Sequence, residues 1–200
     1  MRGTKTIRIS LFDFDGTITK RDTLFEIAKF STGWMQYCIN LIVLLPYLFL
    51  VKFKLVTNQR GKEIFLRKFF GGISKEEFNQ KCISFTKERL PQLIRPGAQS
   101  CINEQLKDGN RVVIVSASPS NWIVPWANKY GIEVISTRLS FHNGRLRGIE
   151  GVNCNGQEKV NRIKQAIDLQ AYEKVIAYGD TKGDLPMLAL ADESHFKPFR

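Results

Sequence analysis

Apolar and polar residues alternate at the start of the chain. Ile7, Ile9 and Leu11 are two residues apart, and two phenylalanines carry the apolar pattern on to residue 14. Alternation is typical of a strand, and an apolar run is typical of a strand that is buried on both faces. We therefore predict a buried strand over residues 7–14, followed at once by a glycine and a threonine.

The next part of the chain has helical signals. Asp22 or Thr23 is suited to cap a helix that runs to about residue 30, because a short polar side chain accepts a hydrogen bond from a free backbone N–H group. A second helix is predicted over residues 63–70. A capping box at residues 74–77, Ser-Lys-Glu-Glu, predicts a third helix that extends toward Leu90.

Residues 30–51 contain no charged side chain. About 20 apolar residues can span a bilayer, but polar residues and Pro46 interrupt this run. We predict two helices broken near Pro46 rather than a membrane span. Lys29 precedes the segment, and Lys52 and Lys54 follow it. Two interpretations stay open: a helical insertion that packs on itself, and a surface that contacts an anionic membrane.

From Pro96 onward, helical and strand patterns alternate. Helices are predicted over residues 98–107, 121–130, 157–169 and 185–191, strands over residues 111–115, 133–136 and 175–178, and a hairpin with an Asn-Gly turn over residues 139–149. This order predicts an α/β fold: a three-layer, Rossmann-like parallel sheet with right-handed crossovers. Residues 1–22 and 91–200 would form the core domain, and residues 23–90 a helical cap domain inserted after the first strand.

Composition limits the classes of partner and the cellular compartment that we expect for this protein. The 200 residues carry a net charge of +11, which favours acidic partners such as nucleic acid, anionic lipid or phosphorylated metabolites. The sequence shows no zinc-finger or RNA-recognition signature, so we expect no nucleic acid. The four cysteines form no CxxC pair, and no apolar leader precedes the first strand. Both features indicate a cytoplasmic protein with free thiols, while oligomeric state is not indicated.

Four carboxylates lie at predicted strand ends: Asp13 and Asp15 after the first strand, and Asp180 and Asp184 after the last. Parallel strands bring their carboxyl ends to one edge of a sheet, where four acids would repel one another unless a cation joined them. Ligands that are all oxygen favour Mg²⁺, and both histidines lie outside these motifs. The alternative for the first pair is an acidic turn that caps the next helix.

Three further residues suit an anion at the same edge. Ser116 ends a predicted strand, and backbone N–H groups from Ala117 onward could form an anion nest. Lys159 begins a predicted helix, where its charge could neutralise a phosphate oxygen. The alternatives are an ordinary serine at a strand end and a solvated lysine.

Trp122 and Trp126, four residues apart, suit either a packing stripe or an apolar substrate entrance.

These residues together resemble the motifs of the haloacid dehalogenase superfamily, over nearly the whole chain. In order, the four motifs are Asp13-Phe14-Asp15-Gly16-Thr17, Ser116, Lys159, and Gly179-Asp180 with Asp184. The resemblance implies an Mg²⁺-dependent phosphatase. Asp13 would attack phosphorus and form an aspartyl phosphate, and Asp15 would act as general acid and then as base. Ser116, Ala117 and Lys159 would bind phosphate, and the metal ligands would be Asp13, the Asp15 carbonyl, Asp180 and Asp184.

The predicted cap lies between the first and second motifs. In this respect the chain resembles the subfamily that includes phosphoserine phosphatases. The apolar insertion and residues 153–160 look most like the phosphatidylglycerophosphate phosphatase C branch and its relatives. Asp22 stands where phosphoserine phosphatases carry a glutamate, and Gly183 where they carry an asparagine. A lipid phosphate, with peripheral contact at the cytoplasmic membrane face, therefore competes with a small soluble phosphate ester. A module without catalysis would have lost one of the four acids, all of which are present.

Overall fold

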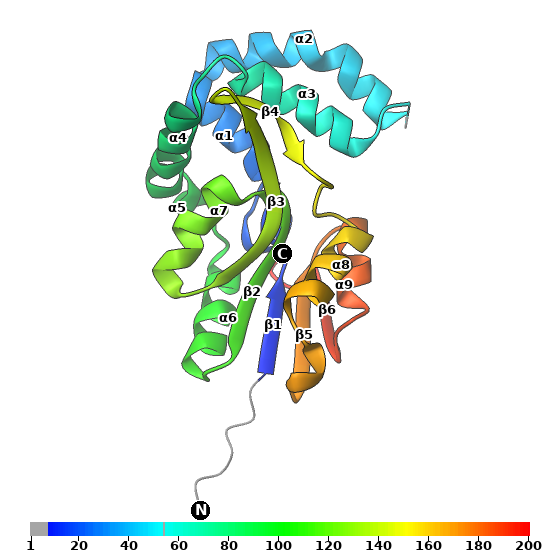
Figure 1. Ribbon diagram of the computed structural model, residues 1–200. Coiled ribbons are helices and arrows are strands. Elements are labelled where there is room, and N and C mark those ends of the chain that lie inside the picture. Colours follow the sequence, from blue (N-terminus) through cyan, green and yellow to red (C-terminus); the bar gives the residue numbers. More distant parts are fainter. Residues whose placement is uncertain (1–7, 54) are drawn as a thin grey trace, which may run out of the picture.

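The computed structural model describes residues 8–53 and 55–200 (Figure 1). Ile7 and Lys54, which figured in the sequence-based predictions, lie outside these residues. The described chain forms a six-stranded sheet in the order β4-β3-β2-β1-β5-β6. Its strands are β1 Arg8–Phe12, β2 Arg111–Pro119, β3 Glu133–His142, β4 Arg145–Glu150, β5 Lys174–Gly179 and β6 Glu193–Phe196. Neighbouring strands are parallel except for the antiparallel pair of β3 and β4.

Successive residues of the central strands point to opposite faces of the sheet. Leu11 of β1 is in register with Val113 and Ala177, and all three pack with Ile163 and Met187. The next residue, Phe12, belongs to the other face, with Ile102 of helix α6 (Pro96–Lys107) and Trp122 of helix α7 (Ser120–Ala127). Because both faces of the sheet are covered, the central strands are apolar throughout, and their apolar runs allowed them to be predicted from the sequence.

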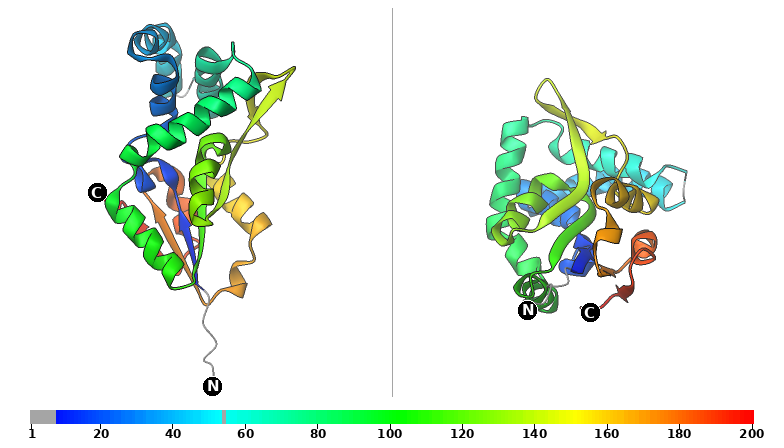
Figure 2. Two further views of the ribbon diagram at one scale, coloured as in Figure 1. Left: turned by 90° about the vertical axis from the view of Figure 1, so that its left-hand side faces the viewer. Right: turned by 60° about the horizontal axis from the view of Figure 1, so that its bottom comes forward.

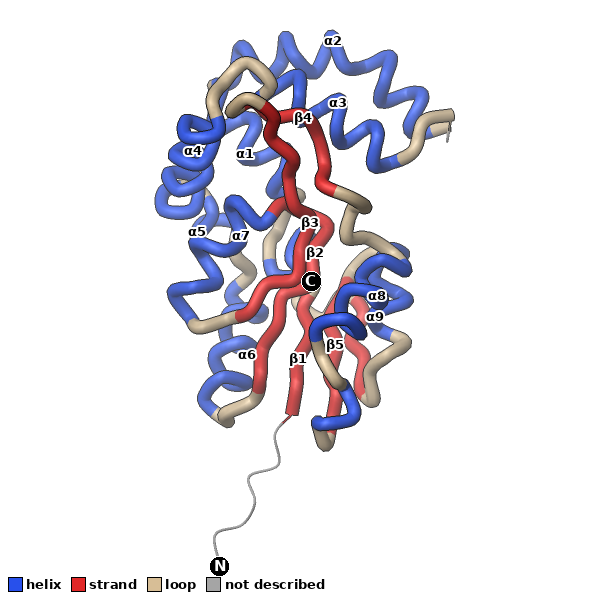
Figure 3. The backbone as a smooth tube through the Cα atoms, in the orientation of Figure 1, coloured by secondary structure: helices blue, strands red, loops and turns tan. Residues whose placement is uncertain are grey.

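Helices therefore cover the sheet on both sides. Helices α6 Pro96–Lys107 and α7 Ser120–Ala127 lie on one side, and α8 Gln157–Ala166 and α9 Leu185–Leu188 on the other (Figures 1 and 3). The predicted three-layer α/β fold is confirmed. The short edge strand β6 was missed, because its sequence ESHF has no apolar run and its residues are at least partly exposed.

Four helices gather beyond the carboxyl ends of β1, β2 and β5: α1 Thr23–Thr32, α2 Trp34–Lys52, α3 Asn58–Phe70 and α4 Lys75–Glu88 (Figures 1 and 2). The short helix α5 Leu90–Leu93 leads back to the sheet. Asp22 and Ser74 cap α1 and α4 through the N–H groups of Leu24 and Glu77. The cap signals in the sequence thus placed both helix starts correctly.

The β3–β4 hairpin extends among these helices. Its turn, at Asn143 and Gly144, has positive φ at both residues, as the Asn-Gly pair predicted. The N–H of Lys75 donates to the carbonyl of Gly144 over 2.7 Å. β3 is one continuous strand rather than a short strand followed by a separate hairpin arm, because pairing to β2 passes directly into pairing to β4.

The predicted break near Pro46 is wrong, since α2 is one helix of 19 residues with Pro46 inside it. The chain turns instead at Gly33, whose φ of 76° separates α1 from α2. A proline can bend a helix without ending it. Packing holds the second half of α2 in line: a Cβ on Gly61 of α3 would lie 2.5 Å from a methyl carbon of Val51.

An ion pair between buried Glu26 and half-buried Arg89 joins the first and last of the four helices. Glu26 of α1 lies 2.8 Å from Arg89, just after α4, and 3.2 Å from Arg21. Burial alone raises the pKa of Glu26, but hydrogen bonds from the two arginines outweigh it and hold that pKa below its ordinary value of 4.5. The ionised form of Glu26 therefore stabilises the folded protein.

We predict that Glu26→Gln lowers the free energy of unfolding at pH 7 by about 1.5–3 kcal/mol, the range for hydrogen bonds to a charged group. The pKa of the glutamate is lower in the folded protein, so the difference from wild type is complete above pH 4.5 and disappears as pH falls through the folded-state pKa. Urea denaturation across that range measures it. Glu173→Gln, at an exposed position, is the control; equal losses in both variants would contradict the assignment.

Candidate active site

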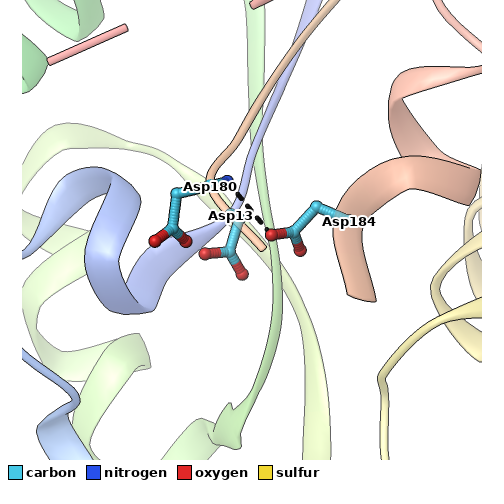
Figure 4. Close-up of side chains that lie close together, drawn as sticks. All are labelled: Asp13, Asp180 and Asp184. Carbon is cyan, nitrogen blue, oxygen red and sulfur yellow. Dashed lines mark hydrogen bonds between the residues drawn. The ribbon is translucent and has the colours of Figure 1, made fainter. Parts of the chain in front are cut away.

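Three carboxylates meet at the carboxyl edge of the sheet. Asp13 follows β1, Asp180 follows β5, and Asp184 ends the short 3-10 turn before α9 (Figure 4). One oxygen from each lies within 4.8 Å of the others, and all three residues are buried. Gly16 lets the neighbouring loop approach: a Cβ there would lie 2.4 Å from Asp180 Oδ2, and its φ of 84° favours glycine. The structure thus brings together three of the four predicted acids.

Lys159 connects this cluster to a third strand. Its ammonium donates to Asp13 Oδ1 over 2.6 Å, to Asp184 Oδ1 over 2.7 Å, and to the carbonyl of Val115 in β2 over 2.7 Å. The side chain is 1% exposed, so the alternative of a solvated lysine is wrong. Burial alone would lower the pKa of Lys159, but the two carboxylates hold it above its ordinary value.

The carboxylates differ in how they are satisfied. Burial raises the pKa of Asp184, but Lys159 and hydrogen bonds from Thr181 outweigh it and hold that pKa below its ordinary value. Burial raises the pKa of Asp13 to about 7, although Lys159 opposes the shift. Burial likewise raises the pKa of Asp180, which pairs with Arg200. Because the ligand atoms are all oxygens, this cluster fits a hard divalent cation such as Mg²⁺.

Asp15 lies apart from the three clustered acids and is held by α1. Its Oδ1 accepts hydrogen bonds from the N–H and the hydroxyl of Thr23, over 2.7 and 2.6 Å. The indole N–H of Trp122 in turn donates to the Thr23 hydroxyl over 2.9 Å. Trp122 and Trp126 are both buried, which confirms the packing interpretation of this pair. Thr23 was recognised only as a possible helix cap, and its contact with Asp15 had no sequence signal.

Ser116 is fully buried, and its hydroxyl accepts the N–H of Ser118 over 3.0 Å. Ala117 and Ser118, rather than Ser116, line the pocket above the carboxylates. Ser116 therefore lies near the carboxyl end of β2, where the register with β3 shifts, and its side chain fixes the local course of the backbone.

The pocket has a volume of about 580 Å³. Its floor is polar and includes Asp13, Asp15, Lys159, Asp180 and Asp184. One wall is apolar and comes from α1, α2 and α3: Leu24, Phe25, Leu48, Val51 and Phe65. The sheet and the helices beyond it thus enclose the carboxylates together.

Lys62 of α3 also lines the pocket. Its ammonium donates to the carbonyl of Ala117 over 2.6 Å and to Asn153 Oδ1 over 3.4 Å, so α3 contacts the carboxyl end of β2. Sequence reasoning missed this residue. It is one of several basic residues after the apolar segment, and no local pattern distinguishes it from the others.

Residues 10–189 match the model of a protein family described as haloacid dehalogenase-like hydrolase. Protein CicA from Caulobacter vibrioides (strain NA1000 / CB15N) is 34% identical over 194 residues, which cover 94% of this chain and 85% of the relative. A histidinol-phosphatase from Neisseria meningitidis serogroup C (strain 8013) is 29% identical over 213 residues, covering 92% and 87%.

Solved structures share the fold. A protein of unknown function from Bordetella pertussis Tohama I superposes with a TM-score of 0.81 at 21% identity, covering 94% of this chain and 89% of that one. A substrate-bound phosphoserine phosphatase superposes with a TM-score of 0.68 at 17% identity, covering 95% and 85%. With the family match over most of its length, this chain belongs to the haloacid dehalogenase-like hydrolase family.

Proposed function

We propose that this protein is an Mg²⁺-dependent phosphomonoester hydrolase that works through an aspartyl-phosphate intermediate. The observation that carries the proposal is Lys159, which bridges Asp13 and Asp184 at the floor of a pocket. A fixed cation beside a strand-end carboxylate is what attack on a phosphate dianion requires, because two anions must approach each other.

Asp13 is the nucleophile. Lys159 holds its Oδ1, which leaves Oδ2 to attack phosphorus in line with the ester oxygen. The new bond joins Oδ2 to phosphorus, and the bond between phosphorus and the ester oxygen breaks with its electron pair on that oxygen. A water then attacks the phosphorus of the acyl phosphate, which releases inorganic phosphate and restores the carboxylate.

Asp15 acts as the general acid and then as the general base. It donates a proton to the leaving alkoxide and takes one from the attacking water. The two hydrogen bonds from Thr23 to Oδ1 fix its orientation, and Trp122 fixes Thr23. The general acid is therefore positioned by α1, a helix that also contributes to the apolar wall of the pocket.

Asp13, Asp180, Asp184 and the backbone carbonyl of Asp15 would hold Mg²⁺. When bound, the ion supplies positive charge to the phosphate oxygens. The backbone N–H groups at Ala117, near the carboxyl end of β2 where Ser116 fixes the backbone, would bind a further phosphate oxygen together with Lys159. This proposal gives Ser116 a positioning role beside the binding role that the sequence suggested.

In the proposed domain arrangement, residues 1–22 and 91–200 form the core and residues 23–90 the cap. The cap supplies the apolar wall, which favours a substrate with an apolar leaving group, such as the lipid phosphate of the phosphatidylglycerophosphate phosphatase C branch.

The second candidate is a small soluble ester, as the names histidinol-phosphatase and phosphoserine phosphatase suggest. Asp22, which also lines the pocket, favours it, because a carboxylate could bind an ammonium group.

The proposal extends to location. We place the protein in the cytoplasm, in peripheral contact with the anionic face of a membrane. Support comes from α2, which is long and apolar enough by length and composition to cross a bilayer, and of which little is buried. Basic residues flank that helix in the sequence.

We predict that Asp13→Asn lowers phosphatase turnover by at least about 1,000-fold, the scale of loss when a nucleophile is removed. The amide has nearly the same shape, so the circular dichroism spectrum should not change. Hydrolysis of p-nitrophenyl phosphate measures turnover, and mass spectrometry after an acid quench should find phosphate on Asp13 of the wild type alone. Substantial activity in the variant, without deamidation, would rule out the covalent mechanism.

We predict that a chelator abolishes activity and that Mg²⁺ restores it, whereas Ca²⁺ restores it poorly because its larger, more flexible shell misplaces the reacting groups. Asp180→Asn should raise the half-saturating Mg²⁺ concentration by at least about tenfold, within the range for weakened metal sites. A titration of activity against Mg²⁺ tests this, with exposed Asp108→Asn as the control. Unchanged Mg²⁺ dependence in Asp180→Asn would show that the ion binds elsewhere.

A further inference from the structure

Helix α2 carries apolar side chains on its outer side as well as on its packed side, where Tyr37, Leu41 and Leu48 join Leu44 in the core. Its buried residues are Asn40 and Leu44, and Gln36 donates to Asn40 over 3.1 Å. Its large exposed side chains are Trp34, Met35, Ile39, Ile42, Val43, Leu45, Tyr47, Phe49 and Leu50. Met35 is 78% exposed and Ile42 65%. A surface helix of a water-soluble domain normally has a polar outer side, and an apolar patch of this size marks a contact surface.

The charge around this surface is of one sign. The sequence contains no acidic residue between Glu26 and Glu63, whereas it contains several basic ones. Lys29 lies 4.7 Å above the ring of Trp34 at the start of α2, and Lys52 is exposed at its end. Tryptophan and lysine side chains of this kind anchor proteins at the level of lipid headgroups. A second copy of the chain would instead bring like charges together.

The packing of α2 on α3 restricts the orientation in which α2 could contact a bilayer. Tyr37, near the start of α2, packs against Phe69 of α3 with ring centres 5.6 Å apart and ring planes tilted by 39°. Val51, near the end of α2, packs on Gly61 of α3. α2 and α3 run side by side, as Figure 1 and the left view of Figure 2 show. α3 carries Arg60, Lys62, Arg67 and Lys68, which lipid tails would not accept. A membrane-crossing α2 would have to leave this charged partner.

The same helix forms part of the pocket. Leu48 and Val51 belong to the apolar wall above Asp15 and Lys62. Phe49 and Leu50, between them in the sequence, are exposed. One helical turn therefore faces the carboxylates on one side and the surroundings on the other, so the wall of the pocket continues into the exposed apolar face.

We propose that α2 lies flat in the headgroup region of an anionic bilayer, and that a lipid phosphomonoester passes from the bilayer along the turn of Leu48 and Val51 into the pocket. This inference rests on the proposed phosphatase function for its second half. The outward side chains of α2 enter the acyl boundary, α3 and its charges stay on the water side, and the acyl chains of the substrate remain in lipid while its phosphate reaches Asp13.

The first test is sedimentation with vesicles of phosphatidylglycerol and phosphatidylcholine, or of phosphatidylcholine alone, at low and high salt. We expect wild type to bind the anionic vesicles and to dissociate at high salt. Ile42→Glu/Phe49→Glu, at exposed positions that do not line the pocket, should bind at least about tenfold more weakly. Gln165→Glu/Gln170→Glu adds the same charge at the far end of the sheet and should bind like wild type.

The same proteins are assayed with p-nitrophenyl phosphate in solution and with phosphatidylglycerophosphate in the vesicles. We expect the α2 variant to keep turnover of the soluble ester and to lose at least about tenfold on the lipid. Failure of wild type to bind, or equal binding by the α2 variant, overturns the inference. Unchanged lipid turnover in a variant that no longer binds overturns the route into the pocket. Lipid binding through α2 without hydrolysis of either ester supports the docking and refutes the phosphatase function instead.

Depth measurements test the flat orientation. Wild-type Trp34, Trp34→Phe/Val43→Trp and Trp34→Phe/Phe53→Trp each place one exposed tryptophan along α2, against the constant background of buried Trp122 and Trp126. Quenching by lipids brominated at different depths should place all three at one shallow level. A helix that crosses the bilayer would place the tryptophan at position 43 deepest, and that result would overturn the orientation.

Discussion

The site depends on one buried ammonium. Lys159 donates to Asp13 after β1, to Val115 in β2, and to Asp184 after β5, so a single charge fixes the ends of three strands. Removing it would leave Asp13 and Asp184 buried without their shared cation, which is costly for a folded protein. The ion pairs hold the carboxylates close enough for a metal ion and leave a pocket above them.

The helices beyond the sheet are bound to it by polar contacts that also shape the site. Thr23 of α1 holds Asp15, and Lys62 of α3 holds the carbonyl of Ala117 near the carboxyl end of β2. Both contacts join a helix of residues 23–90 to the carboxyl edge of the sheet. In the proposed mechanism these contacts position the acid and the phosphate-binding backbone, so the helices there fix the geometry of the site as well as covering it.

Helix α2 exposes apolar side chains, which lowers the solubility of the domain. A soluble domain gains by burying apolar side chains, yet α2 buries Asn40 and exposes Ile42, Val43 and Phe49. The orientation of α2 follows from its packing on α3, where Val51 lies over Gly61. The apolar exterior that results is the observation on which the proposed contact with lipid rests.

Sequence alone determined the α/β class, because strands buried on both faces are apolar throughout, and it located the helix caps at Asp22 and Ser74 through their local hydrogen bonds. It also singled out the clustered acids, since charges at the ends of buried strands need partners, whereas Lys159 was singled out by its place in the order of the family's motifs. Only the tertiary structure decided what depends on distant contacts: the continuity of α2 through Pro46, which packing on α3 maintains, and the roles of Thr23 and Lys62. It also decided which side of α2 faces outward, because an apolar run without periodicity does not specify its own buried face.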